Sequence, residues 1–139
     1  MKESVNVKWN GGMSFEADVM DYKIMMDADP EFGGQRKGPK PKPLLLVALA
    51  GCTGMDIVSL LNKMRIEFKK FNIRVDGDTA DEHPKKFTRI TITYEVTGKN
   101  IDREKVEKAV ILSKEKYCSV SATLKDSVTI DYLIEIIEE

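Results

Sequence analysis

Apolar and polar residues alternate along the first part of the chain. The alternation covers residues 4–9, 13–19 and 22–27, and an Asn-Gly-Gly turn at 10–12 separates the first two stretches. A period of two places every second side chain on the same face of a β-strand. The pattern predicts an antiparallel meander of three strands within residues 1–28.

The longest apolar run of the chain follows a linker of different character. Residues 29–43 are rich in glycine, proline and cations, and three prolines at alternate positions predict an exposed, extended segment that is neither helix nor inner strand. From Leu44 to Cys52 no charged residue occurs, and beyond Cys52 polar residues return on one face. We expect a buried, thiol-bearing helix that begins near Pro43 and ends around Lys70, about seven turns long.

Two strands, a second helix and a last strand are expected in the remainder. Residues 72–81 and 87–97 alternate, and the second of these stretches is rich in β-branched residues. Asp102 is expected to cap a helix that ends near Cys118, and the apolar run at 128–137 predicts the final strand.

These elements define an α+β fold. A chain of 139 residues suits one domain. The expected organisation is a single domain over 1–139, made of a β-meander at 1–28, a Gly/Pro linker at 29–43 and an α/β core at 44–139.

Charge and targeting signals narrow the functional classes. The formal net charge is −1, from 22 basic and 23 acidic residues, so the basic field of a nucleic-acid-binding protein is absent. The N-terminus has charges where a signal peptide needs its apolar centre, and Asp56 interrupts the long apolar run too early for a membrane span. We therefore expect a cytoplasmic protein with no nucleic-acid or membrane partner.

The chemistry-bearing residues are few. Cys52 and Cys118 lie 66 positions apart, which fits neither a Cys-x-x-Cys pair nor a zinc cluster. With His83 as the single histidine, no metal site, catalytic triad or cofactor is expected. A lone cysteine in an apolar helix is commonly a packing residue, so Cys52 is open to both interpretations at this point.

Two segments resemble the cysteine motifs of the OsmC/Ohr family of osmotically inducible and organic-hydroperoxide-resistance proteins. They are GPKPKPLLLVALAGCTGMDIVSLL and AVILSKEKYCSVSATL, and the resemblance, which covers nearly the whole chain, looks strongest to the YhfA-type branch. The resemblance implies an OsmC-like fold and an intertwined homodimer. It also implies a thiol peroxidase of oxidative stress defence, in which Cys52 attacks an organic hydroperoxide, Cys118 resolves the sulfenic acid, and an external dithiol reduces the disulfide.

The surroundings of Cys52 differ from those of the family's peroxidase branch. There, a glutamate before the cysteine helix and an arginine in the N-terminal segment flank the thiol; here Lys42 occupies the glutamate position and the hairpin at 10–13 has no arginine. A buried thiol needs a cation or hydrogen-bond donors to ionise. Arg36 or Lys42 could supply that cation, or both could be solvated linker charges. Asp56, one turn after Cys52, could line the pocket or lie at the surface.

Three functions are compatible with these residues. The leading one is a thiol-dependent peroxidase. A second is a non-catalytic dimer that binds a small hydrophobic ligand or senses redox state, and a third is an enzyme acting on another sulfur or acyl compound. Five apolar side chains could line a ligand pocket or simply pack in the core: Phe15, Met25, Met26, Met55 and Met64.

Overall fold

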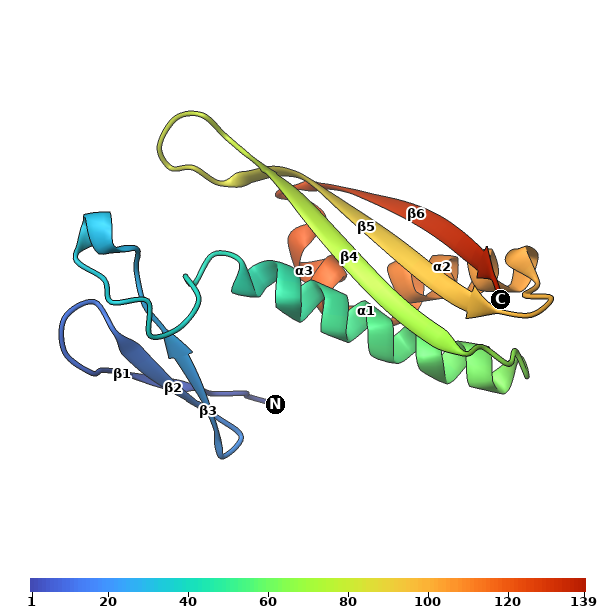
Figure 1. Ribbon diagram of the computed structural model, residues 1–139, viewed down its shortest axis with the longest axis horizontal. Coiled ribbons are helices and arrows are strands. Elements are labelled where there is room, and N and C mark those ends of the chain that lie inside the picture. The colour runs from blue at the N-terminus through green and yellow to red at the C-terminus, as the bar shows by residue number, and fades with distance from the viewer. The chain divides into compact units, whose positions relative to one another are not determined.

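The computed structural model describes all 139 residues, Met1–Glu139. The chain divides into two compact units, Met1–Leu45 and Leu46–Glu139, and each contains its own three-stranded sheet (Figure 1). The predicted α+β class is confirmed. The grouping of residues 1–139 into a single domain stays a prediction.

The first unit contains the predicted meander. Strands β1 (Asn6–Trp9), β2 (Phe15–Val19) and β3 (Tyr22–Met26) pair antiparallel in sequence order. Ala17 is its only buried apolar residue, whereas Trp9 is 66% exposed. A sheet of this size is too small to bury its own apolar side chains.

The linker contains one helical turn that the sequence prediction missed. Residues Pro30–Phe32 form a 3-10 helix, η1, because proline fixes the backbone angle that the first helical position needs. The prolines that exclude helix lie later in the linker. The carboxylate of Asp27 organises the segment by accepting hydrogen bonds from the N–H groups of Ala28 at 2.7 Å and Lys37 at 3.2 Å.

Helix α1 (Leu44–Lys63) is shorter than predicted. It ends seven residues before Lys70 because Arg65 adopts a left-handed conformation, with φ of 59°. The N–H of Ile66 then reaches back to the carbonyl of Leu61 at 2.9 Å, which closes a Schellman motif. Glycine usually occupies this position, so an arginine gave no signal that the helix ends here.

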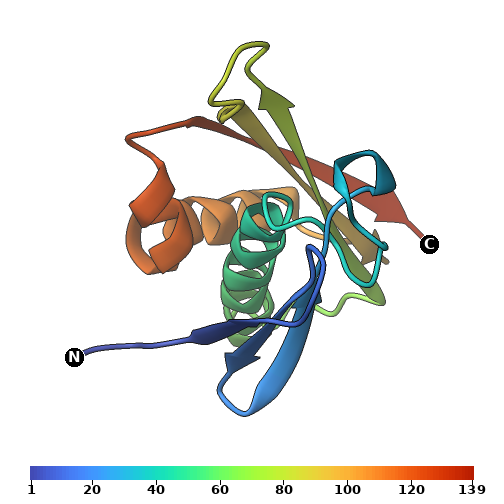
Figure 2. The ribbon, with the colours of Figure 1, turned by 90° about the vertical axis from the view of Figure 1, so that its left-hand side faces the viewer.

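The second unit is built on a mixed sheet of order β4-β5-β6. Strand β4 (Lys70–Thr79) pairs antiparallel with β5 (Phe87–Gly98), and β6 (Thr129–Glu138) pairs parallel with β5. All helices of this unit lie on one face of the sheet (Figures 1 and 2). That face carries the alternate apolar residues of the strands, among them Phe71, Ile73, Ile92, Tyr94 and Ile134.

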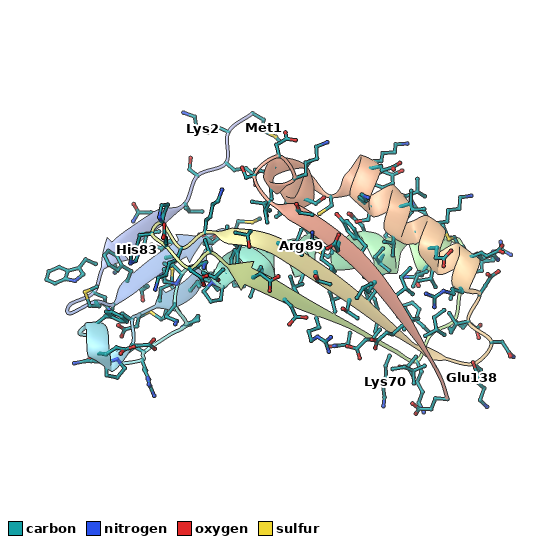
Figure 3. All side chains as sticks on the ribbon, turned by 90° about the horizontal axis from the view of Figure 1, so that it is seen from above. Met1, Lys2, Lys70, His83, Arg89 and Glu138 are labelled. Atoms are coloured by element: carbon teal, nitrogen blue, oxygen red, sulfur yellow. The ribbon has the colours of Figure 1, made fainter.

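The other face of this sheet is largely polar. Lys70 pairs in register with Thr97 at the end where β6 reaches Glu138, and Arg89 pairs with Thr129 near the opposite end. Figure 3 looks onto this face and shows charged side chains between these labelled positions. Arg89 forms an ion pair with Asp131.

The crossover from β5 to β6 differs from the prediction. Helix α2 (Arg103–Leu112) begins as expected at Asp102, whose side chain accepts the N–H groups of Glu104 and Lys105. Instead of continuing as α-helix, the chain forms a π-helical turn, η2 (Ser113–Tyr117), and then a short helix, α3 (Ser119–Leu124), that was not predicted. Six residues give too short a window for a helical period to be recognised.

Helix α1 is buried along one ridge only. Leu49, Thr53, Ile57 and Leu61 recur every four residues and pack in the core, whereas Met55 is 77% exposed. The prediction of a buried helix therefore holds for one face. By length and composition alone, with a mean hydropathy of 2.1, Pro43–Lys63 would also suffice to cross a membrane. Such a composition equally suits a core helix. Contrary to the prediction from the sequence, Asp56 does not shorten the apolar helix below membrane-spanning length.

Candidate active site

Cys52 lies in the middle of α1, beside the buried ridge. Its side chain is half-buried and packs against the core of the second unit. The Cys52 Sγ lies 3.7 Å from the Ser119 Oγ at the start of α3. Residues 67 positions apart in the sequence are thus neighbours.

Cys118 lies between the π-turn and α3 and is buried, with 3% of its surface exposed. Its N–H donates to the carbonyl of Ser113 at 2.8 Å, a bond that closes the π-turn. Its sulfur accepts the N–H of Ser121 at 3.4 Å, which makes Cys118 the N-cap of α3. The Ser121 hydroxyl donates a hydrogen bond to the Cys118 carbonyl at 3.1 Å.

The first N–H groups of α3 are directed at the two sulfurs. The opening turn of any helix has N–H groups without partners inside the helix. In α3, the N–H groups of Ser119 and Val120 lower the pKa of the Cys52 thiol, and that of Ser121 bonds the Cys118 sulfur. This arrangement was missed in the sequence because α3 itself was not predicted. The serines on either side of Val120 were the only available signal.

The two thiols differ in acidity. Burial raises the pKa of Cys52, but the N–H of Val120, the Cys118 thiol and both groups of Ser119 outweigh it, so the pKa of Cys52 is lowered overall. Burial raises the pKa of Cys118, and together with the neighbouring Cys52 sulfur it outweighs the bonds from Ser121, which lower that pKa. Cys52 therefore ionises first, while the Cys118 thiol stays protonated and donates to it.

The other predicted site residues lie elsewhere. Asp56 is in the second unit, where its carboxylate accepts a hydrogen bond from the Ser113 hydroxyl at 2.9 Å. Arg36 and Lys42 belong to the first unit, and their action on Cys52 stays a prediction. The donors that lower the pKa of Cys52 are backbone and side-chain groups at the start of α3. No cluster of His, Cys, Asp and Glu side chains could hold a metal ion.

An apolar groove runs along the open face of α1. It has a volume of about 920 Å³ and lies between this face and β4. Met55, one of the predicted lining residues, contributes to it, whereas Met64 packs against the core. The small residues Gly51 and Gly54 leave room along its floor, together with the apolar residues Val47, Val58, Phe71 and Ile73.

This fold, with one thiol on the long helix and a second at the start of a short one, matches a known family. The model of the OsmC-like protein family matches residues 33–132, and the chain belongs to that family. Protein YhfA of Escherichia coli strain K12 is 33% identical to this chain over 132 residues, which are 94% of the chain and 96% of that protein. The predicted family resemblance, with its YhfA-type branch, is confirmed.

Solved structures extend the comparison. A hypothetical protein from Aquifex aeolicus VF5 superposes with a TM-score of 0.87 and 32% identity, covering 100% of this chain and 98% of the other. An organic hydroperoxide resistance protein of Legionella pneumophila shares the fold, with a TM-score of 0.70 over 95% of this chain and 96% of the other, at 17% identity. The OsmC-like fold class is thereby confirmed.

Proposed function

We propose that this protein is a thiol-dependent peroxidase that reduces organic hydroperoxides. The observation that carries the proposal is the division of roles between the thiols: the more accessible Cys52 has the lowered pKa, and the buried Cys118 has the raised one. A thiolate is the nucleophile in such chemistry, whereas a resolving thiol need only be held close to it.

The proposed cycle balances in three steps. The Cys52 thiolate attacks the outer oxygen of the hydroperoxide and the O–O bond breaks, so that Cys52 becomes a sulfenic acid and the alkoxide leaves and takes a proton from solvent to give the alcohol. The Cys118 thiol then displaces water from that sulfenic acid, which forms the Cys52–Cys118 disulfide. An external dithiol reduces this disulfide by two exchange steps and is itself oxidised to a disulfide.

The proposed setting is a cytoplasmic homodimer in oxidative stress defence. Apolar side chains of the meander and of the open face of α1 remain exposed in the single chain, among them Trp9, Tyr22 and Met55. A second copy of the chain would cover such surfaces. The name of the Legionella pneumophila protein, which shares the fold, supports the choice of hydroperoxide as substrate.

Arg36 or Lys42 is proposed to add a cation near Cys52, beyond the groups of α3. The two sources of stabilisation respond differently to salt, because a mobile side-chain charge is screened and fixed N–H groups in contact with the sulfur are not. If the linker contributes, Arg36→Ala or Lys42→Ala will raise the pKa measured by alkylation of Cys52, and added salt will do the same in the wild type. If neither substitution nor added salt changes the pH profile of Cys52 alkylation, the groups of α3 remain as the source of the lowered pKa, without a contribution from the linker.

Hydroperoxide consumption tests the function. The wild type should consume cumene hydroperoxide repeatedly in the presence of a dithiol, and Cys52→Ser should consume none. Cys118→Ser should reduce about one equivalent and then stop, because its sulfenic acid has no thiol partner in the chain. Equal turnover by the wild type and Cys52→Ser, or no consumption by the wild type with several dithiols, would refute the proposal.

One observation favours a second candidate function, a ligand-binding or redox-sensing protein on the same scaffold. The groove between α1 and β4 is predominantly apolar and large enough, at about 920 Å³, for a small hydrophobic molecule. In that case an apolar fluorescent probe should bind equally to the wild type and Cys52→Ser, while neither consumes peroxide. Substitution of Met55 by Lys, in the groove, should abolish binding of the probe.

A further inference from the structure

Four side chains form a continuous hydrogen-bonded chain behind the two thiols. The Tyr94 hydroxyl lies 2.7 Å from the Thr53 Oγ1, and this oxygen lies 2.8 Å from the Ser113 Oγ. The Ser113 Oγ in turn lies 2.9 Å from the Asp56 carboxylate. Tyr94, Thr53 and Ser113 are each at most 1% exposed. None of the four is a reactant in the three steps of the proposed cycle.

The carboxylate at the end fixes the direction of the whole chain. An ionised carboxylate only accepts hydrogen bonds, so the Ser113 hydroxyl must donate to Asp56. Because the Ser113 proton is engaged by Asp56, Ser113 can only accept the hydrogen bond from Thr53. The Thr53 proton is then engaged by Ser113, so Thr53 can only accept the hydrogen bond from Tyr94. Burial raises the pKa of Tyr94, which keeps this phenol protonated and able to donate. One arrangement of protons therefore satisfies every hydroxyl in the chain.

This chain holds the two elements that carry the thiols. Thr53 directly follows Cys52 on α1, and the Ser113 carbonyl accepts the Cys118 N–H at 2.8 Å. The π-turn between Ser113 and Cys118 is a rare conformation and is commonly found at functional sites. The same residues could instead form an α-helical or a 3-10 turn, each of which contains fewer residues than a π-turn. A change to one of these turns would move Cys118 relative to Cys52.

We propose that Asp56 is a positioning residue, which acts through Ser113 and Thr53 to hold the π-turn and α3 against α1. This holds the N–H groups of α3 at the Cys52 sulfur and the Cys118 thiol beside it. The proposal rests on the proposed use of Cys52 and Cys118 as a reacting pair. It adds that a carboxylate hydrogen-bonded to Ser113, and acting through that residue, sets the reactivity of both sulfurs.

Thiol measurements test this without reference to peroxide. Asp56→Ala removes the terminal acceptor, and Thr53→Val breaks the chain in the middle with little change of shape. Thr53→Ser restores the hydroxyl and serves as the conservative rescue. Thr93→Val is the matched control, because Thr93 is equally buried, adjoins Tyr94 on β5, and its hydroxyl has no hydrogen-bond partner. The readouts are the pH profile of Cys52 alkylation and the rate at which diamide forms the Cys52–Cys118 disulfide.

Asp56→Ala and Thr53→Val should raise the pKa of Cys52 toward that of an ordinary cysteine and slow disulfide formation roughly 10- to 100-fold, as expected for a displacement of about 1 Å. Thr53→Ser and Thr93→Val should match the wild type. The proposal is overturned if Asp56→Ala and Thr53→Val keep the wild-type profile and rate, or if Thr93→Val changes them equally. Should Thr53→Val not fold, Asp56→Ala decides alone, since Asp56 is only half-buried.

Failure of the proposed function gives a different result. A wild type that forms the disulfide with diamide but consumes no hydroperoxide would refute the peroxidase and leave the positioning role intact. A wild type in which Cys52 and Cys118 never join would refute the pairing, and the positioning proposal with it.

Discussion

Thr53→Val and Thr93→Val remove the same hydroxyl from two buried threonines, and we expect opposite effects on the free energy of unfolding. The Thr53 Oγ1 bonds both the Tyr94 hydroxyl, at 2.7 Å, and the Ser113 Oγ, at 2.8 Å. The Thr93 Oγ1 is buried without a partner. Each threonine is 1% exposed, and valine reproduces the shape and branching of both.

The magnitudes follow from which groups lose a partner. Without the Thr53 hydroxyl, the Tyr94 phenol keeps its proton but has no acceptor, and a buried donor left unsatisfied costs about 1–3 kcal/mol. Removing the unpaired Thr93 hydroxyl relieves a desolvation cost of about 0.5–2 kcal/mol. The two variants should therefore differ by roughly 3 kcal/mol, with Thr53→Val below the wild type and Thr93→Val above it.

Urea unfolding at one fixed protein concentration measures this difference. The slope m should be the same in all three proteins, because the surface exposed on unfolding does not change, and only the midpoint should move. A shift of both variants in the same direction would refute the reasoning, as would a Thr53→Val protein as stable as the wild type. A Thr53→Val protein as stable as the wild type would mean that the chain of hydroxyls contributes no net stability, and a less stable Thr93→Val protein would mean that the Thr93 hydroxyl is not a net cost.

Three further expectations concern other parts of the chain. Iodoacetamide should label Cys52 before Cys118 and with a lower apparent pKa; simultaneous labelling would contradict the assigned acidities. The N–H groups of Ala28, then of Lys37, lower the pKa of Asp27 in the folded protein. The ionised carboxylate therefore contributes its full stabilisation above about pH 4, the pKa of aspartate in the unfolded chain. This contribution is lost as the pH falls through the lower pKa of the folded protein. In Asp27→Asn, the free energy of unfolding measured against pH should lose this acid-dependent part. An unchanged decrease in stability at low pH would exclude the contribution of Asp27. Arg65→Gly should raise the free energy of unfolding by about 1 kcal/mol, because glycine adopts a positive φ without strain, and an unchanged urea midpoint would contradict this.

Elements with a strong local signal were predictable. Strand β5 alternates cleanly over FTRITITYEVTG, and Asp102 caps α2 as its residue type predicts. The end of α1 was not predictable, because Arg65 takes a conformation that its side chain does not favour and tertiary contacts of the following Ile66 hold it there. The π-turn before Cys118 and the six residues of α3 carry no periodic pattern of their own.

The two thiols of the candidate site could be predicted from the sequence, and its electrostatics could not. Cys52 and Cys118 could be named from their motifs, and the structure brings their side chains together. Two of the groups that lower the pKa of Cys52, the N–H groups of Ser119 and Val120, could not be named, because every residue except proline carries an N–H. From side chains alone, the cations of Arg36 and Lys42 were the candidates for stabilising the Cys52 thiolate.

The position of Cys118 gives this thiol two roles that substitutions separate. As the N-cap of α3 it helps to fix the N–H groups that lower the pKa of Cys52, and as a thiol it can form the disulfide. Serine is among the best N-cap residues and alanine among the poorer ones. Cys118→Ser should therefore remove the disulfide and keep the lowered pKa of Cys52, whereas Cys118→Ala removes both. The activity of Cys118→Ala alone would overstate the part played by resolution, because the attacking thiol is weakened as well.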